Sequence, residues 1–179
     1  MKALVIYESM FGSTHELADA IADGLRDSCE VDVIRADEVQ QVEVDTADLL
    51  VVGGPTHAHS LSTEASRREA ARMSTDPGGG LHLEDPSMTE GLRGWLDDVT
   101  TLPTQIAAFD TRSDMPRLLT GAASKRIERE LRHKGAVAVV PAESFLVEKY
   151  AGLKAGELER GRAWGRTVAE KMLATAASE

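Results

Sequence analysis

The residues best placed for chemistry form one short stretch near the N-terminus, where hydroxyl groups surround a glycine. This stretch, residues 8–14, contains Ser9, Gly12, Ser13 and Thr14. The apolar residues 4–7 before it predict a short buried strand, and the apolar residues after it recur at helical spacing. A strand that runs through such a loop into a helix gathers free backbone N–H groups and the positive end of the helix dipole at one point. We therefore predict an anion site here.

The residues that this stretch lacks narrow the kind of anion site. No Lys or Arg lies between Lys2 and Arg26, so a bound phosphate would meet neutral donors. The glycine spacing is not Gly-x-Gly-x-x-Gly, which excludes the dinucleotide fingerprint. It is not Gly-x-x-x-x-Gly-Lys-Ser/Thr either, which excludes the loop of nucleotide triphosphatases.

The elements that must position this loop alternate along the chain. Apolar runs predict strands at 30–34, 47–54, 105–109 and 136–140, of which 47–54 suits a central parallel strand and 30–34 an edge strand. Helical spacing predicts helices near 63–73, 92–99, 121–133 and 157–174, and residues 87–90 match a capping box. Residues after Pro141 are expected to be irregular. This alternation predicts a parallel sheet covered by helices.

The first strand, loop and helix also carry a family signature. Its matched positions are Val5, Ile6, Tyr7, Ser9, Gly12, Thr14, Ala18 and Ile21. From residue 2 to about 172 the chain resembles flavodoxins. The resemblance implies an α/β three-layer fold with a five-stranded parallel sheet, strand order 2-1-3-4-5, and helices on both faces. It further implies FMN as cofactor, with the FMN phosphate cradled by residues 9–14.

The implied strand order brings three loops together, because the carboxyl ends of strands one, three and four lie side by side. By resemblance, loops 55–60 and 110–116 flank the isoalloxazine ring. The expected cofactor-binding residues are Ser9, Met10, Phe11, Gly12, Ser13, Thr14, Pro55, Thr56, His57, Ala58, His59, Asp110, Thr111, Arg112 and Ser113. No catalytic residue is assigned, and no metal site, because two histidines at His57 and His59 are too few ligands.

The expected ring site departs from the family in two ways. Flavodoxins usually cover the ring with aromatic side chains, but residues 55–62 and 110–121 contain no Trp, Tyr or Phe. Because aromatic pairs contribute roughly 0.5–1.5 kcal/mol beyond their area, FMN binding about tenfold weaker is expected. Arg112 is always protonated, and if it points inward it would stabilise an anionic reduced flavin and favour two-electron chemistry. The alternative is an outward Arg112 that pairs with Asp110 or Asp114.

Length, charge and cysteine content limit the number of domains, the partners and the location that we expect for this protein. A chain of 179 residues predicts one domain, 1–179, with a turn-rich, mobile loop at 75–88. The net charge of −10 argues against nucleic acid and is typical of acidic electron carriers that steer toward basic partners. No apolar run is long enough to span a membrane, and the N-terminus enters the first strand directly, which indicates a cytoplasmic protein. Cys29 is the single cysteine, so no internal disulfide is possible.

These observations favour an FMN-binding redox protein in electron transfer, working with a partner protein or a small molecule such as NAD(P)H or a quinone. It could be a carrier or a small two-electron reductase. The alternative is a flavodoxin-like module with weak or lost FMN binding that acts through a protein partner. A receiver-type signalling domain needs an acidic pair after strand one and an Asp ending strand three. Residues 8–9 and 53–54 are Glu-Ser and Gly-Gly instead.

Overall fold

The structure, a computed structural model, describes residues 1–57, 60–74, 82–84, 91–148 and 152–177. Within these residues one sheet has the strand order β2-β1-β3-β4-β6-β7, with β5 also paired to β4. Its strands are β1 Lys2–Tyr7, β2 Glu30–Arg35, β3 Leu49–Pro55, β4 Gln105–Ser113, β5 Val137–Ala138, β6 Glu143–Glu148 and β7 Gly152–Leu153. Every pairing is parallel except that of β6 with β7.

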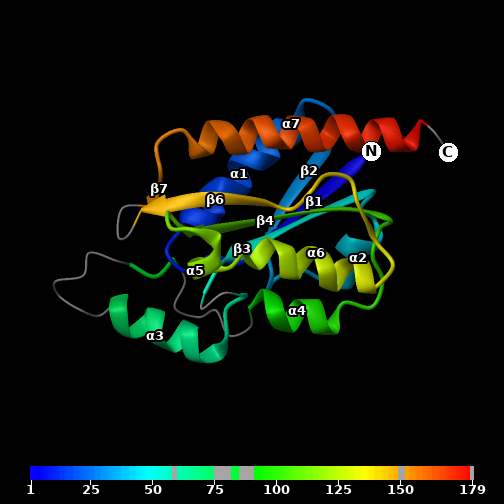
Figure 1. Cartoon of the computed structure of the whole chain (residues 1–179). Helices are drawn as coiled ribbons and strands as arrows, with labels where there is room; N and C mark the ends of the chain where they lie inside the picture. The colour runs from blue at the N-terminus through cyan, green and yellow to red at the C-terminus, as the bar shows by residue number, and fades with distance from the viewer. Residues whose placement is uncertain (58–59, 75–81, 85–90, 149–151, 178–179) are drawn as a thin grey trace.

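Helices cover both faces of this sheet (Figure 1). They are α1 Ser13–Arg26, α2 Gln41–Asp45, α3 Glu64–Ser74, α4 Leu92–Asp98, α5 Arg117–Thr120, α6 Ala123–His133 and α7 Glu157–Ala176. On one face, buried residues of β1, β3 and β4 pack against α1 and α7; on the other, the alternate strand residues pack against α2, α4 and α6. The predicted three-layer flavodoxin-like fold and the order 2-1-3-4 are thereby confirmed.

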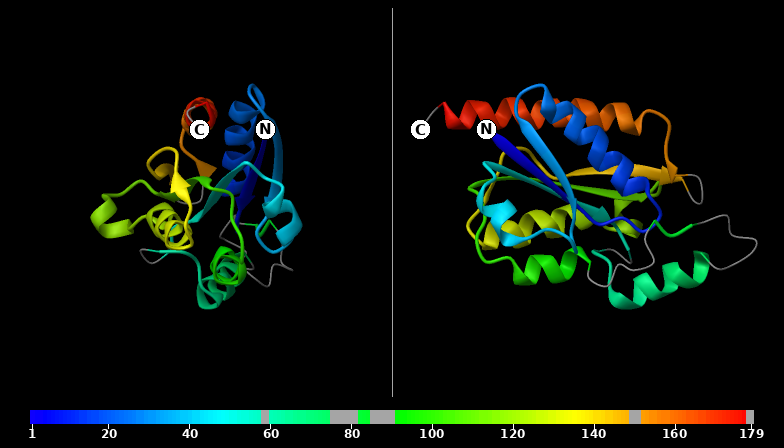
Figure 2. Two further views of the ribbon diagram at one scale, coloured as in Figure 1. Left: turned by 90° about the vertical axis from the view of Figure 1, so that its right-hand side faces the viewer. Right: turned by 180° about the vertical axis from the view of Figure 1, so that it is seen from behind.

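Close packing of α1 on α7 fixes the helix that opens at the predicted anion loop. A Cβ on Gly24 of α1 would lie 2.1 Å from the carbonyl oxygen of Arg162, and a Cβ on Gly165 of α7 would lie 2.2 Å from that of Ile21. Only glycine permits backbones to approach this closely. The two helices lie side by side over one face of the sheet (Figure 2), so α1 is held against the body of the fold.

The fifth strand differs from the prediction. It is divided into β5, much shorter than the expected 136–140, and β6, which occupies a stretch expected to be irregular. Val137 pairs with Gln105 and Glu143 with Phe109, so the offset from β4 grows from 32 to 34 residues across the break. Pro141 lies in this break and has no N–H to donate to β4. The chain detaches there, and the sheet carries more strands than the five expected.

Strand β4 is also longer than predicted, because it continues from Phe109 to Ser113. Its polar residues are tolerated in a buried strand since Asp110 and Thr111 both find hydrogen-bond partners on neighbouring elements. Most of the expected mobile loop at 75–88 and the capping box at 87–90 lie outside the described residues. None of the helices in the described ranges has the length and apolar character that crossing a membrane would require.

Candidate functional site

The loop between β1 and α1 has the geometry of an anion cradle. Gly12 has a φ of +89°, a conformation that glycine adopts readily, and its N–H donates to Ser9 Oγ at 3.0 Å. Helix α1 starts at Ser13, and its N-cap residue, Gly12, has no side chain to cap it. Among the described residues no side chain accepts a hydrogen bond from the first-turn N–H groups, and the hydroxyls of Ser13 and Thr14 lie beside them. Uncapped N–H groups and the helix dipole favour an anionic group at this point.

Hydrogen bonds tie this loop to the ends of β3 and β4. Thr14 Oγ1 lies 2.8 Å from Thr111 Oγ1, and both residues are buried. The Thr111 carbonyl accepts the N–H of Thr56 at 2.8 Å. The Thr56 hydroxyl then accepts the N–H of Ala123 at 2.9 Å, at the start of α6. Three segments far apart in sequence are thus held in one arrangement.

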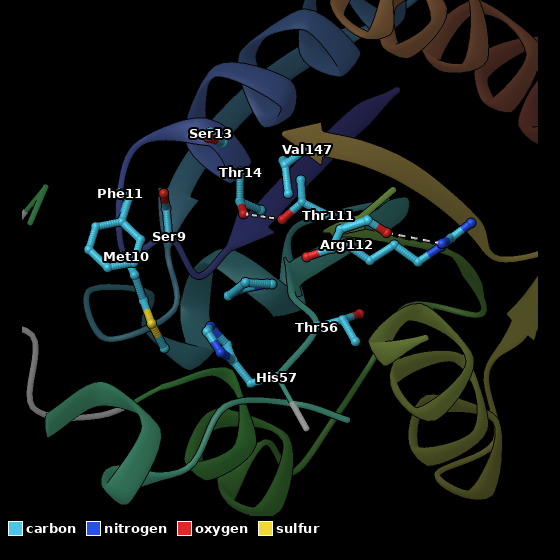
Figure 3. Close-up of a pocket in the computed structure, with 12 residues that line it drawn as sticks. Ser9, Met10, Phe11, Ser13, Thr14, Thr56, His57, Thr111, Arg112 and Val147 are labelled. Carbon is cyan, nitrogen blue, oxygen red and sulfur yellow. Dashed lines mark hydrogen bonds between the residues drawn. The ribbon is translucent and has the colours of Figure 1, made fainter. Parts of the chain in front are cut away.

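A pocket of about 220 Å³ opens where these segments meet (Figure 3). Its walls come from the α1 loop, the end of β3 and the end of β4, as the predicted convergence requires. The lining residues are Ser9, Met10, Phe11, Ser13, Thr14, Pro55, Thr56, His57, Thr111, Arg112, Ser113 and Val147. Phe11 is the one aromatic hydrocarbon ring among them, and it comes from the anion loop rather than from either ring-flanking segment.

Two of the described residues predicted for the site do not line this pocket, and two further predicted residues are not described. Gly12 shapes the loop without facing the cavity, and Ala58 and His59 lie outside the described residues. Asp110 is fully buried and turns toward α6, where its Oδ2 accepts the N–H of Ser124 at 2.7 Å. Burial raises the pKa of the Asp110 carboxyl above its ordinary value of 3.8, and hydrogen bonds from Ser124 offset part of the rise.

Val147 is the lining residue that sequence reasoning missed. It lies on β6, opposite Ser113 of β4, and so completes the wall of the pocket (Figure 3). The run Glu-Ser-Phe-Leu-Val-Glu has the β-branched and aromatic content of a strand. That signal could have placed Val147 beside β4. However, Pro141 lies shortly before this run, and the segment after it was expected to be irregular.

His57 lines the pocket, and partial burial disfavours the charged form of its imidazole. Burial lowers the pKa of His57 below its ordinary 6.5, and the charge of Glu8 opposes this change to a smaller extent. The segment is held by paired backbone hydrogen bonds between His57 and Ser60, at 2.7 and 2.9 Å. Behind it, the buried Glu8 carboxylate accepts the Ser62 hydroxyl and, at 2.8 Å, the N–H of Leu92.

Arg112 lines the pocket, but its guanidinium extends away from the other lining side chains (Figure 3). Its Nη1 donates to the carbonyls of Ser113 and Met115, at 3.3 and 2.7 Å, which holds the chain as it leaves β4. Asp114, one of the expected partners of an outward Arg112, instead pairs with Lys154 at 2.5 Å. Among the described residues no three His, Cys, Asp or Glu side chains gather in a metal-binding group.

The three-layer fold, with its glycine-containing loop between β1 and α1, defines the flavodoxin-like class of protein. Residues 4–67 match the family model described as Flavodoxin domain. The chain is 37% identical to a flavodoxin of Aquifex aeolicus over 68 residues, covering 37% of each protein. It is 30% identical to an uncharacterized protein of Methanocaldococcus jannaschii over 104 residues, 55% of this chain and 25% of that one. The matches therefore cover only 25% and 37% of the length of these two curated relatives.

The whole fold has solved counterparts at lower identity. One is the structure of a flavodoxin from the domain Archaea, with a TM-score of 0.65 and 20% identity, covering 96% of this chain and 99% of that one. Likeness at this identity concerns the fold alone. The protein is thus flavodoxin-like in sequence over its N-terminal third and in fold over nearly its whole length.

Proposed function

We propose that this protein binds FMN and acts in electron transfer. The observation that carries the proposal is the uncapped start of α1, beside the hydroxyls of Ser9, Ser13 and Thr14, opening into a pocket formed by the ends of β3 and β4. The donors there are neutral and polar, which fits a phosphate group. The curated flavodoxin that the chain matches supports the same cofactor.

The residues of the pocket divide into two groups by what they would do for FMN. The loop with Ser9, Ser13 and Thr14 would hold the phosphate, while Thr56, His57 and Arg112 would border the ring. A bound flavin supplies the redox chemistry, and the protein supplies position and charge. The imidazole of His57, whose charged form burial disfavours, would add a polar surface, and the Arg112 guanidinium would add a positive charge that favours an anionic reduced cofactor. We propose on this basis two-electron reduction rather than a stabilised one-electron carrier.

The test of FMN binding uses the purified chain. We expect absorbance near ~370 and ~450 nm and release of FMN on denaturation, or recovery of that spectrum when the flavin-free chain is given FMN. Ser13→Asp should weaken FMN binding at least tenfold, because it puts a negative charge where the phosphate would lie, and should leave riboflavin binding unchanged. Ser28→Asp adds the same charge just beyond the opposite end of α1 and should change neither.

Two outcomes would redirect the proposal. A chain that shows no flavin spectrum and binds no FMN would favour the module that acts only through a protein partner, which the lack of ring-flanking aromatics supports. An FMN-loaded chain that oxidises NADH or NADPH without another protein would identify a reductase. One that needs a partner reductase would identify an electron carrier.

A further inference from the structure

Three large apolar side chains are exposed on one short segment beside the pocket. Met115, Leu118 and Leu119 are 50%, 91% and 59% exposed, and no residue of the one-turn helix α5 is buried. Single exposed apolar residues are common on soluble proteins, but several gathered on one segment indicate an interaction site. Helix α5 projects from the side of the fold beside the start of α6 (Figures 1 and 2), so a partner can reach it.

Hydrogen bonds tie both ends of this segment to the pocket. Before α5, the Met115 N–H donates to the Ser113 carbonyl at 2.8 Å, and the Met115 carbonyl accepts Arg112 Nη1 at 2.7 Å. Both Arg112 and Ser113 line the pocket. After α5, the N–H of Ala123 donates to the hydroxyl of Thr56, which is another lining residue. A protein bound to α5 would therefore lie next to the pocket.

The charge of this region is opposite to that of the whole chain. Residues 112–134 contain seven Lys or Arg and three Asp or Glu, a net charge of +4 in a chain of −10, so the remaining residues carry −14. Arg117 and Lys125 are exposed, and among the described residues neither has an acidic side chain within ion-pair distance. Asp114 is paired with Lys154, outside this stretch. The whole-chain charge favours basic partners, but this surface favours acidic ones.

Three further cations of this stretch lie on α6 and are only partly compensated. Arg126 and Arg129 share the single carboxylate of Glu130, at 3.7 and 3.6 Å. Arg132 pairs with Glu128 at 2.9 Å. Partly exposed ion pairs of this kind are weak. Because two guanidinium groups face one carboxylate, α6 keeps a positive field next to the apolar segment.

From these observations we infer that α5 and the start of α6 form a docking surface for an acidic protein. Protein interfaces place apolar side chains at the centre and charged ones at the rim. Here Leu118 and Leu119 supply the apolar centre, and Arg117 and Lys125, on either side of them in the chain, supply the charge. The rest of this chain would repel an acidic partner, which would therefore approach on the side of the pocket. This surface goes beyond the proposed function, because binding to it requires no flavin.

The probe for this surface is a plant-type ferredoxin, a small acidic iron–sulfur protein. Isothermal titration calorimetry measures its binding to the flavin-free chain at low and at physiological ionic strength. We expect binding at low ionic strength that weakens at least fivefold at physiological ionic strength, because salt screens the attraction between exposed charges.

Two matched pairs of variants locate the contact. Lys125→Glu should weaken ferredoxin binding at least threefold, because it reverses a charge at the rim. Lys171→Glu makes the same change on an exposed lysine of α7, across the sheet from α6, and should weaken binding less than twofold. Leu118→Ser should weaken binding at least fivefold, because it removes apolar area that the partner would cover. Leu173→Ser changes a 40% exposed leucine of α7 and should leave binding unchanged.

The outcomes separate the docking surface from FMN binding. Absence of ferredoxin binding at low ionic strength, or equal losses in a variant and its matched control, overturns the inference and leaves the FMN proposal intact. If sedimentation shows dimers that Leu118→Ser disrupts, the surface holds a second copy of this chain and the inference is equally wrong. Failure to bind FMN, with the expected ferredoxin results, overturns only the proposed function. Thermal unfolding of each variant confirms that it is folded.

Discussion

Thr14 and Thr111 join their hydroxyls at 2.8 Å in the interior of the protein, across 97 residues of sequence. Thr14 belongs to the first turn of α1, and Thr111 to the end of β4. This hydrogen bond therefore connects the part of the pocket that would hold a phosphate to the part that would border a flavin ring. Thr111 extends the connection to Thr56 through its carbonyl group.

Replacing Thr111 by Val should lower the free energy of unfolding by about 1–3 kcal/mol, because it leaves the buried Thr14 hydroxyl without its partner. Thr111→Ser keeps the hydroxyl and should lose clearly less. Urea denaturation of both variants measures the difference. Equal losses in the two variants would show that the methyl group of Thr111, and not the hydrogen bond, stabilises this position.

The loop at the start of α1 could be predicted from sequence because everything that shapes it is local. The residues of β1, the left-handed Gly12 and the first turn of α1 lie within one short stretch. The position of the segment with Thr56 and His57 followed from topology, since the carboxyl ends of neighbouring parallel strands meet at one edge of the sheet. Neither of these two predictions depended on a contact between side chains that are distant in sequence.

The parts of the site that sequence reasoning missed depend on distant contacts. Asp110 looked like a loop residue facing the ligand, but its carboxylate accepts the Ser124 N–H and caps α6. Val147 reaches the pocket only because the chain rejoins β4 after the interruption at Pro141, in a shifted register. Neither the capping bond nor the register shift leaves a periodic signal in the sequence.

Asp110→Asn should gain stability relative to the parent protein as pH rises. The folded-state pKa of Asp110 lies above its ordinary 3.8 because of burial, so between these two values the folded chain binds more protons than the unfolded one. The parent therefore loses stability as pH rises through that window, whereas the variant, with a neutral amide, does not. Urea unfolding at several pH values from about 3.5 to 7 tests this.

The control for Asp110 is Asp98→Asn, which removes an exposed carboxylate of α4. Its stability should follow that of the parent across the same pH range. We subtract the free energy of unfolding of the parent from that of Asp110→Asn. A value that stays constant or falls as pH rises would contradict the raised pKa of Asp110.

Arg112→Gln should lower the two-electron reduction potential of the bound flavin. Under the proposed function the positive charge of Arg112 would stabilise an anionic reduced cofactor, and unit charges a few ångströms apart interact by about 1–4 kcal/mol, equivalent to roughly 20–90 mV for two electrons. Equilibration with dyes of known potential measures the change. Arg117→Gln removes a neighbouring exposed charge that does not line the pocket and should alter the potential much less. An equal change of potential in both variants would show that Arg112 has no special effect on the flavin and only binds the backbone of residues 113–115.

His57 should titrate below its ordinary pKa of 6.5, because burial disfavours its charged form. Between the folded-state value and 6.5 the unfolded chain binds more protons than the folded one, so stability is lost as pH falls through that window. In His57→Gln this acid-side loss should be smaller, while His82→Gln, which removes an exposed histidine, should keep it. The ring proton shifts of His57, followed by NMR from about pH 8 to 4.5, measure the pKa directly. A midpoint at or above 6.5 would mean that the imidazole in the pocket is charged under mildly acidic conditions, and that it offers a bound flavin a cation rather than a neutral surface.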